Sequence, residues 1–123
     1  MDIASLLDGW QRGIMDAVAL KLSKFGGISA VRRARDLCLH LGAKMCIEDT
    51  WGSDITTSAL LHIGISTQPA RLMNVCDLSG YVAPRLDAAA PARQSGRIAP
   101  SKQVGLGVQP NMDLLGTAEL ILD

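Results

Sequence analysis

The sequence lacks an excess of charge of either sign. Its 12 lysines and arginines balance its 12 aspartates and glutamates, so no global charge favours nucleic acid or an anionic membrane surface as a partner. The sequence also lacks an apolar run of ~18 residues, the length that a bilayer-spanning helix requires. No secretory hydrophobic region follows Met1, and a cytoplasmic location is the default expectation.

Cysteine and histidine are too few and too scattered for a disulfide framework or a zinc site. The cysteines are Cys38, Cys46 and Cys76, with no CxxC spacing and no clustered histidine. Nucleotide-binding patterns of the Walker or GxGxxG type are missing as well. The Gly26-Gly27 pair before a predicted helix is therefore interpreted as a tight turn in preference to a phosphate-binding loop.

The pattern that is present is an alternation of short apolar runs and helical stripes. The apolar runs are 18–22, 45–47 and 72–76. Between them, Ser29 and Asp54 are the candidate N-caps of two amphipathic helices. Strand, helix, strand, helix, strand is the order of βαβ units in a parallel sheet. We predict one α/β unit over 1–123, with a βαβαβ core at 16–82 and a loop-rich closing segment at 83–123.

Weaker signals occur at the two ends of the chain. The first seven residues predict a short amphipathic helix. From Ala83 the composition shifts to Ala, Pro, Gly and Arg, which indicates loops. Short strands are predicted near 97–99 and 118–122.

Strand parity separates the chemistry-bearing side chains from the core. If Val18 and Leu20 face the helices, then Lys21 points to the opposite face, because successive strand residues alternate. The same parity turns Cys46 and Glu48 of the second strand to that face. Asn74 and Cys76 follow on the third strand, and Asp49 and Asp77 stand at the strand tips, where parallel sheets place their active sites.

Parity alone leaves bland alternatives open. A strand lysine commonly extends its ammonium group to water, and Glu48 is a suitable ion-pair partner for Lys21. Trp51 suits a packing or loop-anchoring role as well as a ligand platform. His40 and His62 fall on the helices, away from the strand tips, and are assigned no role.

Four segments together resemble the mandelate racemase/muconate lactonizing group of the enolase superfamily. The segments are Leu20-Lys21-Leu22-Ser23-Lys24-Phe25-Gly26-Gly27-Ile28-Ser29, Cys46-Ile47-Glu48-Asp49-Thr50-Trp51-Gly52-Ser53-Asp54-Ile55, Cys76-Asp77-Leu78-Ser79-Gly80-Tyr81 and Gly105-Leu106-Gly107-Val108. They are similar to the ends of the sixth, seventh and eighth barrel strands and to the closing turn. The second segment resembles the hydroxyproline-directed members. The resemblance implies the C-terminal portion, about strands 6–8 with their helices, of a (β/α)8 TIM barrel.

The resemblance also implies a chemistry. Members of this superfamily remove the proton α to a carboxylate, and Mg²⁺ stabilises the resulting enediolate. By position, Lys21 matches the sixth-strand lysine that acts as base or acid. Glu48, Asp49 and Trp51, with Cys76 and Asp77, match positions beside a small carboxylate substrate such as a cyclic amino acid. Ser79 replaces the second aspartate of an Asp-x-Asp pair found in dipeptide epimerases, which argues against a dipeptide.

The resemblance covers too little chain for a whole site. A complete barrel takes ~250 residues, and the family's metal carboxylates and second lysine precede the matched region. No Mg²⁺ ligand is therefore assigned here, and the chain alone is expected to be inactive. The leading hypothesis is part of a Mg²⁺-dependent dehydratase or epimerase of a hydroxyproline-like amino acid. The alternative is a non-catalytic barrel relic that binds itself or a partner, and exposed sheet edges make a homo-oligomer an expectation in either case.

Overall fold

The computed structural model describes residues 2–49 and 51–120. In chain order the elements are α1 (Ile3–Gln11), β1 (Ala17–Lys21), α2 (Leu22–Phe25), α3 (Ile28–Leu41), β2 (Lys44–Glu48), α4 (Asp54–Ile65), β3 (Leu72–Val75), the 3-10 turn η1 (Ser79–Tyr81) and α5 (Met112–Leu115). The three strands form one parallel sheet in the order β1-β2-β3. The predicted alternation of strands and helices is confirmed.

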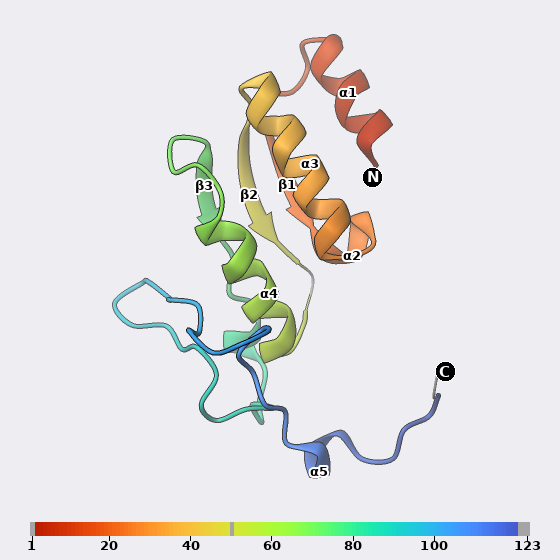
Figure 1. Ribbon diagram of the computed structural model, residues 1–123. Coiled ribbons are helices and arrows are strands. Elements are labelled where there is room, and N and C mark those ends of the chain that lie inside the picture. Colours follow the sequence, from red (N-terminus) through yellow and green to blue (C-terminus); the bar gives the residue numbers. More distant parts are fainter. Residues whose placement is uncertain (1, 50, 121–123) are drawn as a thin grey trace.

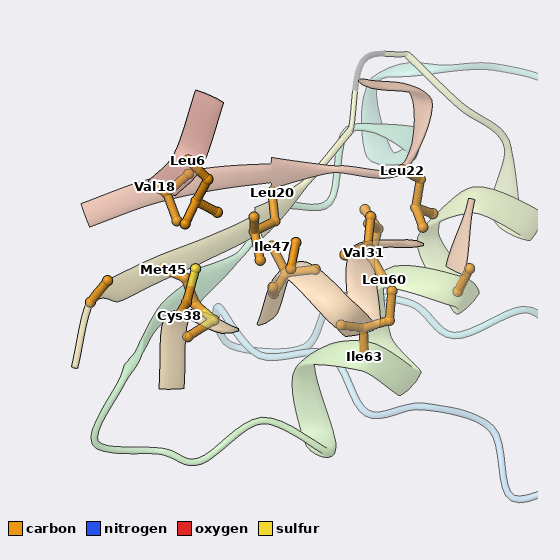
Figure 2. Close-up of a cluster of buried hydrophobic side chains, with 13 residues drawn as sticks. Leu6, Val18, Leu20, Leu22, Val31, Cys38, Met45, Ile47, Leu60 and Ile63 are labelled. Atoms are coloured by element: carbon orange, nitrogen blue, oxygen red, sulfur yellow. The ribbon is translucent and has the colours of Figure 1, made fainter. Parts of the chain in front are cut away.

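Helices α3 and α4 pack on the same face of the sheet (Figure 1). Right-handed crossovers between neighbouring parallel strands require this arrangement. The core lies between these helices and the strands (Figure 2) and includes Leu20, Val31, Cys38, Met45, Ile47, Leu60 and Ile63. The opposite face of the sheet has no helix over it in the described part of the chain.

The helix boundaries correct two predicted caps. Helix α3 begins at Ile28 after Gly27, whose φ of 116° suits glycine, so Ser29 lies inside the helix and does not cap it. Helix α4 is capped by Ser53, whose side chain accepts from the Ile55 N–H. Asp54 is the first helical residue, and its carboxylate bonds elsewhere.

The N-terminal helix is confirmed and runs further than predicted, to Gln11. Asp2 caps it by accepting from the Ser5 N–H at 2.8 Å. Leu6 is 2% exposed and lies beside Val18 in the core (Figure 2), which ties the helix to β1. Met1 lies outside the described residues.

The segment after η1 is largely irregular, as its composition predicts. At 97–99 an isolated antiparallel bridge joins Gln94 to Arg97 across a turn, and no strand forms there. Residues 118–120 carry no strand, and 121–122 lie outside the described residues. From α5 to residue 120 the chain extends away from the sheet (Figure 1). None of the described helices has the length and apolar character needed to cross a membrane.

Candidate functional site

The candidate site occupies the sheet face opposite the helices. Along β1 and β2 the residues alternate between buried and more exposed positions, with Leu20, Met45 and Ile47 at 0% exposure on the helix side. Lys21 and Glu48 fall on the other side. The predicted parity of these two strands is therefore confirmed, and their polar side chains face away from the core.

Strand β3 contains an irregularity that the sequence pattern did not reveal. Met45 pairs with Leu72, but Cys46 pairs with Asn74, so Met73 is an additional residue in the ladder. The bulge leaves Met73 58% exposed. It also aligns Asn74 with Cys46 on the face away from the helices, as predicted.

Lys21 and Glu48 form an ion pair at the carboxyl ends of β1 and β2. The two residues are register partners, and Lys21 Nζ lies 3.4 Å from Glu48 Oε1. Their side chains are 30% and 26% exposed, so the pair is only partly screened by water. The ion pair between Lys21 and Glu48, which the sequence left open as an alternative, is present in the structure. It also fixes an amine at the end of a parallel strand, where such sheets carry out chemistry.

Asp49 turns its carboxylate into the protein. The residue is 6% exposed, and its two oxygens accept from the Ser23 N–H at 3.1 Å and from Ser23 Oγ at 2.5 Å. These bonds join the end of β2 to the first turn of α2, directly after Lys21. The expected substrate contact of Asp49 stays a prediction.

Asp77 is engaged in a similar way at the end of β3. It accepts from Arg93 Nη2 at 3.2 Å and Nε at 3.4 Å, from Ser79 Oγ at 3.0 Å and from the Gly80 N–H at 3.2 Å. Its side chain is 13% exposed. Ser79, which stands where the resemblance expected an aspartate, therefore binds Asp77 within the protein.

Cys76 and Trp51 differ in their surroundings. The Cys76 N–H donates to the Ile47 carbonyl at 2.9 Å, which extends the β2–β3 ladder. Burial first, and then the negative charges of Glu48 and Asp77, raise the pKa of its thiol. Trp51 is 70% exposed and meets Tyr81 edge to face at a ring-centroid distance of 6.1 Å. It lines a cleft of about 380 Å³ beyond the strand tips.

An ionic network that sequence reasoning missed organises the loops around this site. The Asp54 side chain is 2% exposed and accepts from Arg85 Nε at 3.0 Å, from Arg85 Nη2 at 2.5 Å and from the Asp87 N–H at 3.2 Å. Asp87 in turn accepts from the N–H groups of Gln109 and Ala89 at 2.8 Å each, and these bonds lower the pKa of its carboxyl group. The only signal in the sequence was an aspartate at a helix start.

Metal ligands do not converge in the described part of the chain. No group of three histidine, cysteine, aspartate or glutamate side chains among residues 2–49 and 51–120 is arranged to hold an ion. Glu48 pairs with a lysine, and the carboxylates of Asp49, Asp54 and Asp77 are engaged by hydroxyl, amide or guanidinium donors. These residues do not fit a magnesium site.

The sequence is similar to a known protein family and to a characterised enzyme. Residues 2–114 match the sequence model of the family described as enolase C-terminal domain-like. A cis-3-hydroxy-L-proline dehydratase of Roseibium aggregatum is 39% identical over 112 residues, which cover 91% of this chain and 30% of that protein.

Two solved structures from Roseovarius nubinhibens share the fold. The first, a mandelate racemase/muconate lactonizing enzyme, gives a TM-score of 0.88 at 30% identity, covering 94% of this chain and 31% of its own. The second, an enolase-superfamily member complexed with magnesium, gives 0.90 at 28% identity, covering 94% and 32%. The chain thus spans about a third of the length of the relatives it matches. The expected fold class, part of a (β/α)8 barrel, is confirmed.

Proposed function

The chain belongs to the enolase C-terminal domain-like family, and we propose that it carries the proton-transferring lysine of a Mg²⁺-dependent enzyme. The reaction is removal of the proton α to a carboxylate, in a dehydratase or epimerase of a hydroxyproline-like cyclic amino acid. The substrate class rests on the likeness to a protein named cis-3-hydroxy-L-proline dehydratase. Because the chain spans 30% of that relative, the whole activity is a proposal about a larger assembly.

One observation carries the proposal. Lys21 ends a parallel strand on the sheet face that the helices leave uncovered, with its Nζ held 3.4 Å from Glu48. In its neutral form an amine at this position can accept a proton from a substrate over the strand ends, and in its ammonium form it can return one. The ion pair with Glu48 holds the Nζ at the end of the strand.

The proposal assigns the remaining predicted residues to the substrate that this lysine would act on. We place the substrate beside Glu48, Trp51, Cys76 and Asp77, at the ends of β2 and β3. The Asp77 carboxylate already accepts four hydrogen bonds, from Arg93 Nε and Nη2, Ser79 Oγ and the Gly80 N–H, so the contribution we propose for it is its negative charge beside the substrate. The exposed Trp51 ring provides an apolar surface for a small ring such as pyrrolidine.

Magnesium enters the proposal only as a partner of the whole enzyme. A divalent cation supplies electrostatic stabilisation of the negative charge that proton loss leaves on a carboxylate. The described residues do not fit such an ion, so its ligands are proposed to come from another part of the enzyme. The relative complexed with magnesium supports this cofactor at the level of the family.

A chimera tests the proposal. Residues 2–114 replace the matching segment of the Roseibium aggregatum dehydratase, and turnover of cis-3-hydroxy-L-proline is measured with Lys21→Met and Lys24→Met variants. We expect the chimera to be active and Lys21→Met to lower its rate at least ~100-fold, the lower end for losing a general acid or base. Lys24 is exposed on α2 and its variant serves as the matched control.

Two results would contradict the proposal. Unchanged turnover in the Lys21→Met chimera would show that Lys21 does not transfer the proton. A folded chimera that neither dehydrates the substrate nor exchanges its α-proton in D₂O would exclude the substrate class. Exchange without dehydration would assign epimerisation, because the two reactions share the first proton transfer. The chain alone is expected to show no turnover.

One observation favours the alternative, a non-catalytic module that associates with itself. In the described residues β1 and β3 each have one edge without a strand partner, and open edges bind other strands. Sedimentation velocity on the isolated chain tests this function. A discrete oligomer together with an inactive chimera would support the module, whereas a monomer would exclude self-association.

A further inference from the structure

The turn that follows Lys21 begins without a cap of its own. Helix α2 starts at Leu22, which places Lys21 at the N-cap position in extended geometry, φ −111° and ψ 130°. A cap side chain must accept a hydrogen bond from the first turn, and an ammonium group has no acceptor. No side-chain cap bond is formed from this position.

Asp49, directly after the neighbouring strand β2, supplies the missing acceptor. Its carboxylate accepts from the Ser23 N–H at 3.1 Å, the second amide of α2, which is the amide that a local cap would satisfy. The other oxygen accepts from Ser23 Oγ at 2.5 Å. Since Asp49 is 6% exposed, little water competes for either bond.

Two consecutive residues, Glu48 at the end of β2 and Asp49 directly after it, therefore hold Lys21 at two points. Glu48 contacts the Nζ at the end of the side chain, and Asp49 holds the backbone N–H of Ser23, two residues after Lys21. Leu22, between the two points, is 9% exposed and anchored in the core. We infer that Asp49 is a positioning residue, a cap contributed by the residue that directly follows β2, which sets where the Lys21 amine lies. Calling this amine the reacting group rests on the proposed function.

This assignment explains the residue types at three positions. Position 21 must be a lysine for the chemistry, so it cannot hold the serine, threonine, aspartate or asparagine that caps usually require. The capping acceptor is instead the residue directly after the next strand, where a carboxylate can accept two bonds at once. Ser23 presents both a backbone and a side-chain donor to it. The role differs from the substrate contact that the sequence suggested for Asp49.

Competitive acetylation of the lysines in the isolated chain tests the inference without requiring turnover. The protein is labelled with limiting acetic anhydride, and the rates at Lys21, Lys44 and Lys102 are measured by peptide mass spectrometry. The variants are Asp49→Asn, Ser23→Ala and Ser23→Thr, with Glu48→Gln setting the rate for a lysine that has lost its partner. Lys44, at the opposite end of β2, and Lys102 serve as internal references.

We expect Asp49→Asn and Ser23→Ala to raise the Lys21 rate about threefold relative to both references, a factor appropriate to loosening a partly exposed ion pair. Ser23→Thr keeps the hydroxyl and should restore the wild-type rate. An unchanged Lys21 rate in both variants, with a raised rate in Glu48→Gln, would overturn the inference. A parallel rise at all three lysines would also overturn it, because the effect would then be global. Neither result depends on whether Lys21 transfers a proton.

Discussion

Replacing Asp54 by asparagine should release the loop-rich segment from helix α4. Asparagine keeps the shape but loses the charge and one acceptor oxygen, while Arg85 Nε and Nη2 and the Asp87 N–H still point at the site. Breaking a buried ion pair costs ~3–5 kcal/mol. The Arg85 side chain is 34% exposed and recovers part of its hydration, so we expect a loss of about 2 kcal/mol in the free energy of unfolding.

Urea unfolding measures this loss directly. With a slope of about 2 kcal/mol/M, the midpoint should fall by about 1 M. Trypsin provides a local readout, because release of the segment should speed cleavage after Arg93 and Arg97. Asp8→Asn is the matched control, since Asp8 and Arg12 form an i,i+4 pair with side chains 64% and 65% exposed. Surface pairs of this kind contribute less than ~1 kcal/mol. A midpoint shift in Asp54→Asn no larger than that in Asp8→Asn would refute the reasoning.

Two further predictions concern the core. Gly64→Ala should destabilise the fold by ~1–3 kcal/mol, because the new Cβ would collide with Val75 Cγ2. Gly9→Ala should stabilise it by up to ~1 kcal/mol, since Gly9 is inside α1 and only Met15 lies near the new Cβ, at 3.8 Å. Thermal melts in which the two variants shift the melting temperature in the same direction would contradict this prediction. Burial raises the pKa of Cys38 from 9.0 to about 11. Above pH ~9 the unfolded thiol ionises while the folded one stays protonated, so stability should fall by about 2 kcal/mol between pH 9 and 11. The decline should flatten in Cys38→Ala when urea midpoints are compared across pH, and an equal slope in both proteins would exclude Cys38 as its source.

Several features of the protein could be predicted from local pattern. The apolar runs and helical stripes predict β1, β2, α3 and α4, because burial on one face imposes periods of 2 and 3.6 on the sequence. The same period of two predicts that the side chains of Lys21 and Glu48 both point to the sheet face opposite the core. Parallel strands of similar length then bring these ends to one edge, where the ion pair forms.

The cap positions were less accessible to sequence reasoning. Ser29 and Asp54 are both good capping residues, yet the chain uses Gly27 and Ser53. At the first site the positive φ of Gly27 fixes the entry into α3. At the start of α4, Ser53 and Asp54 are both suitable capping residues, but Asp54 forms an ion pair with Arg85 instead. Local propensity does not decide between such neighbours.

Only the tertiary structure determined the hydrogen-bond partner of each carboxylate. Asp49 bonds to Ser23, 26 positions away, Asp54 to Arg85, 31 positions away, and Asp77 to Arg93, 16 positions away. The sequence by itself determined that Asp49 and Asp77 follow apolar strand runs and that Asp54 stands at the start of a helix. Which donor satisfies each carboxylate depends on how separate segments pack, and packing brings together residues whose spacing in the chain carries no periodic signal.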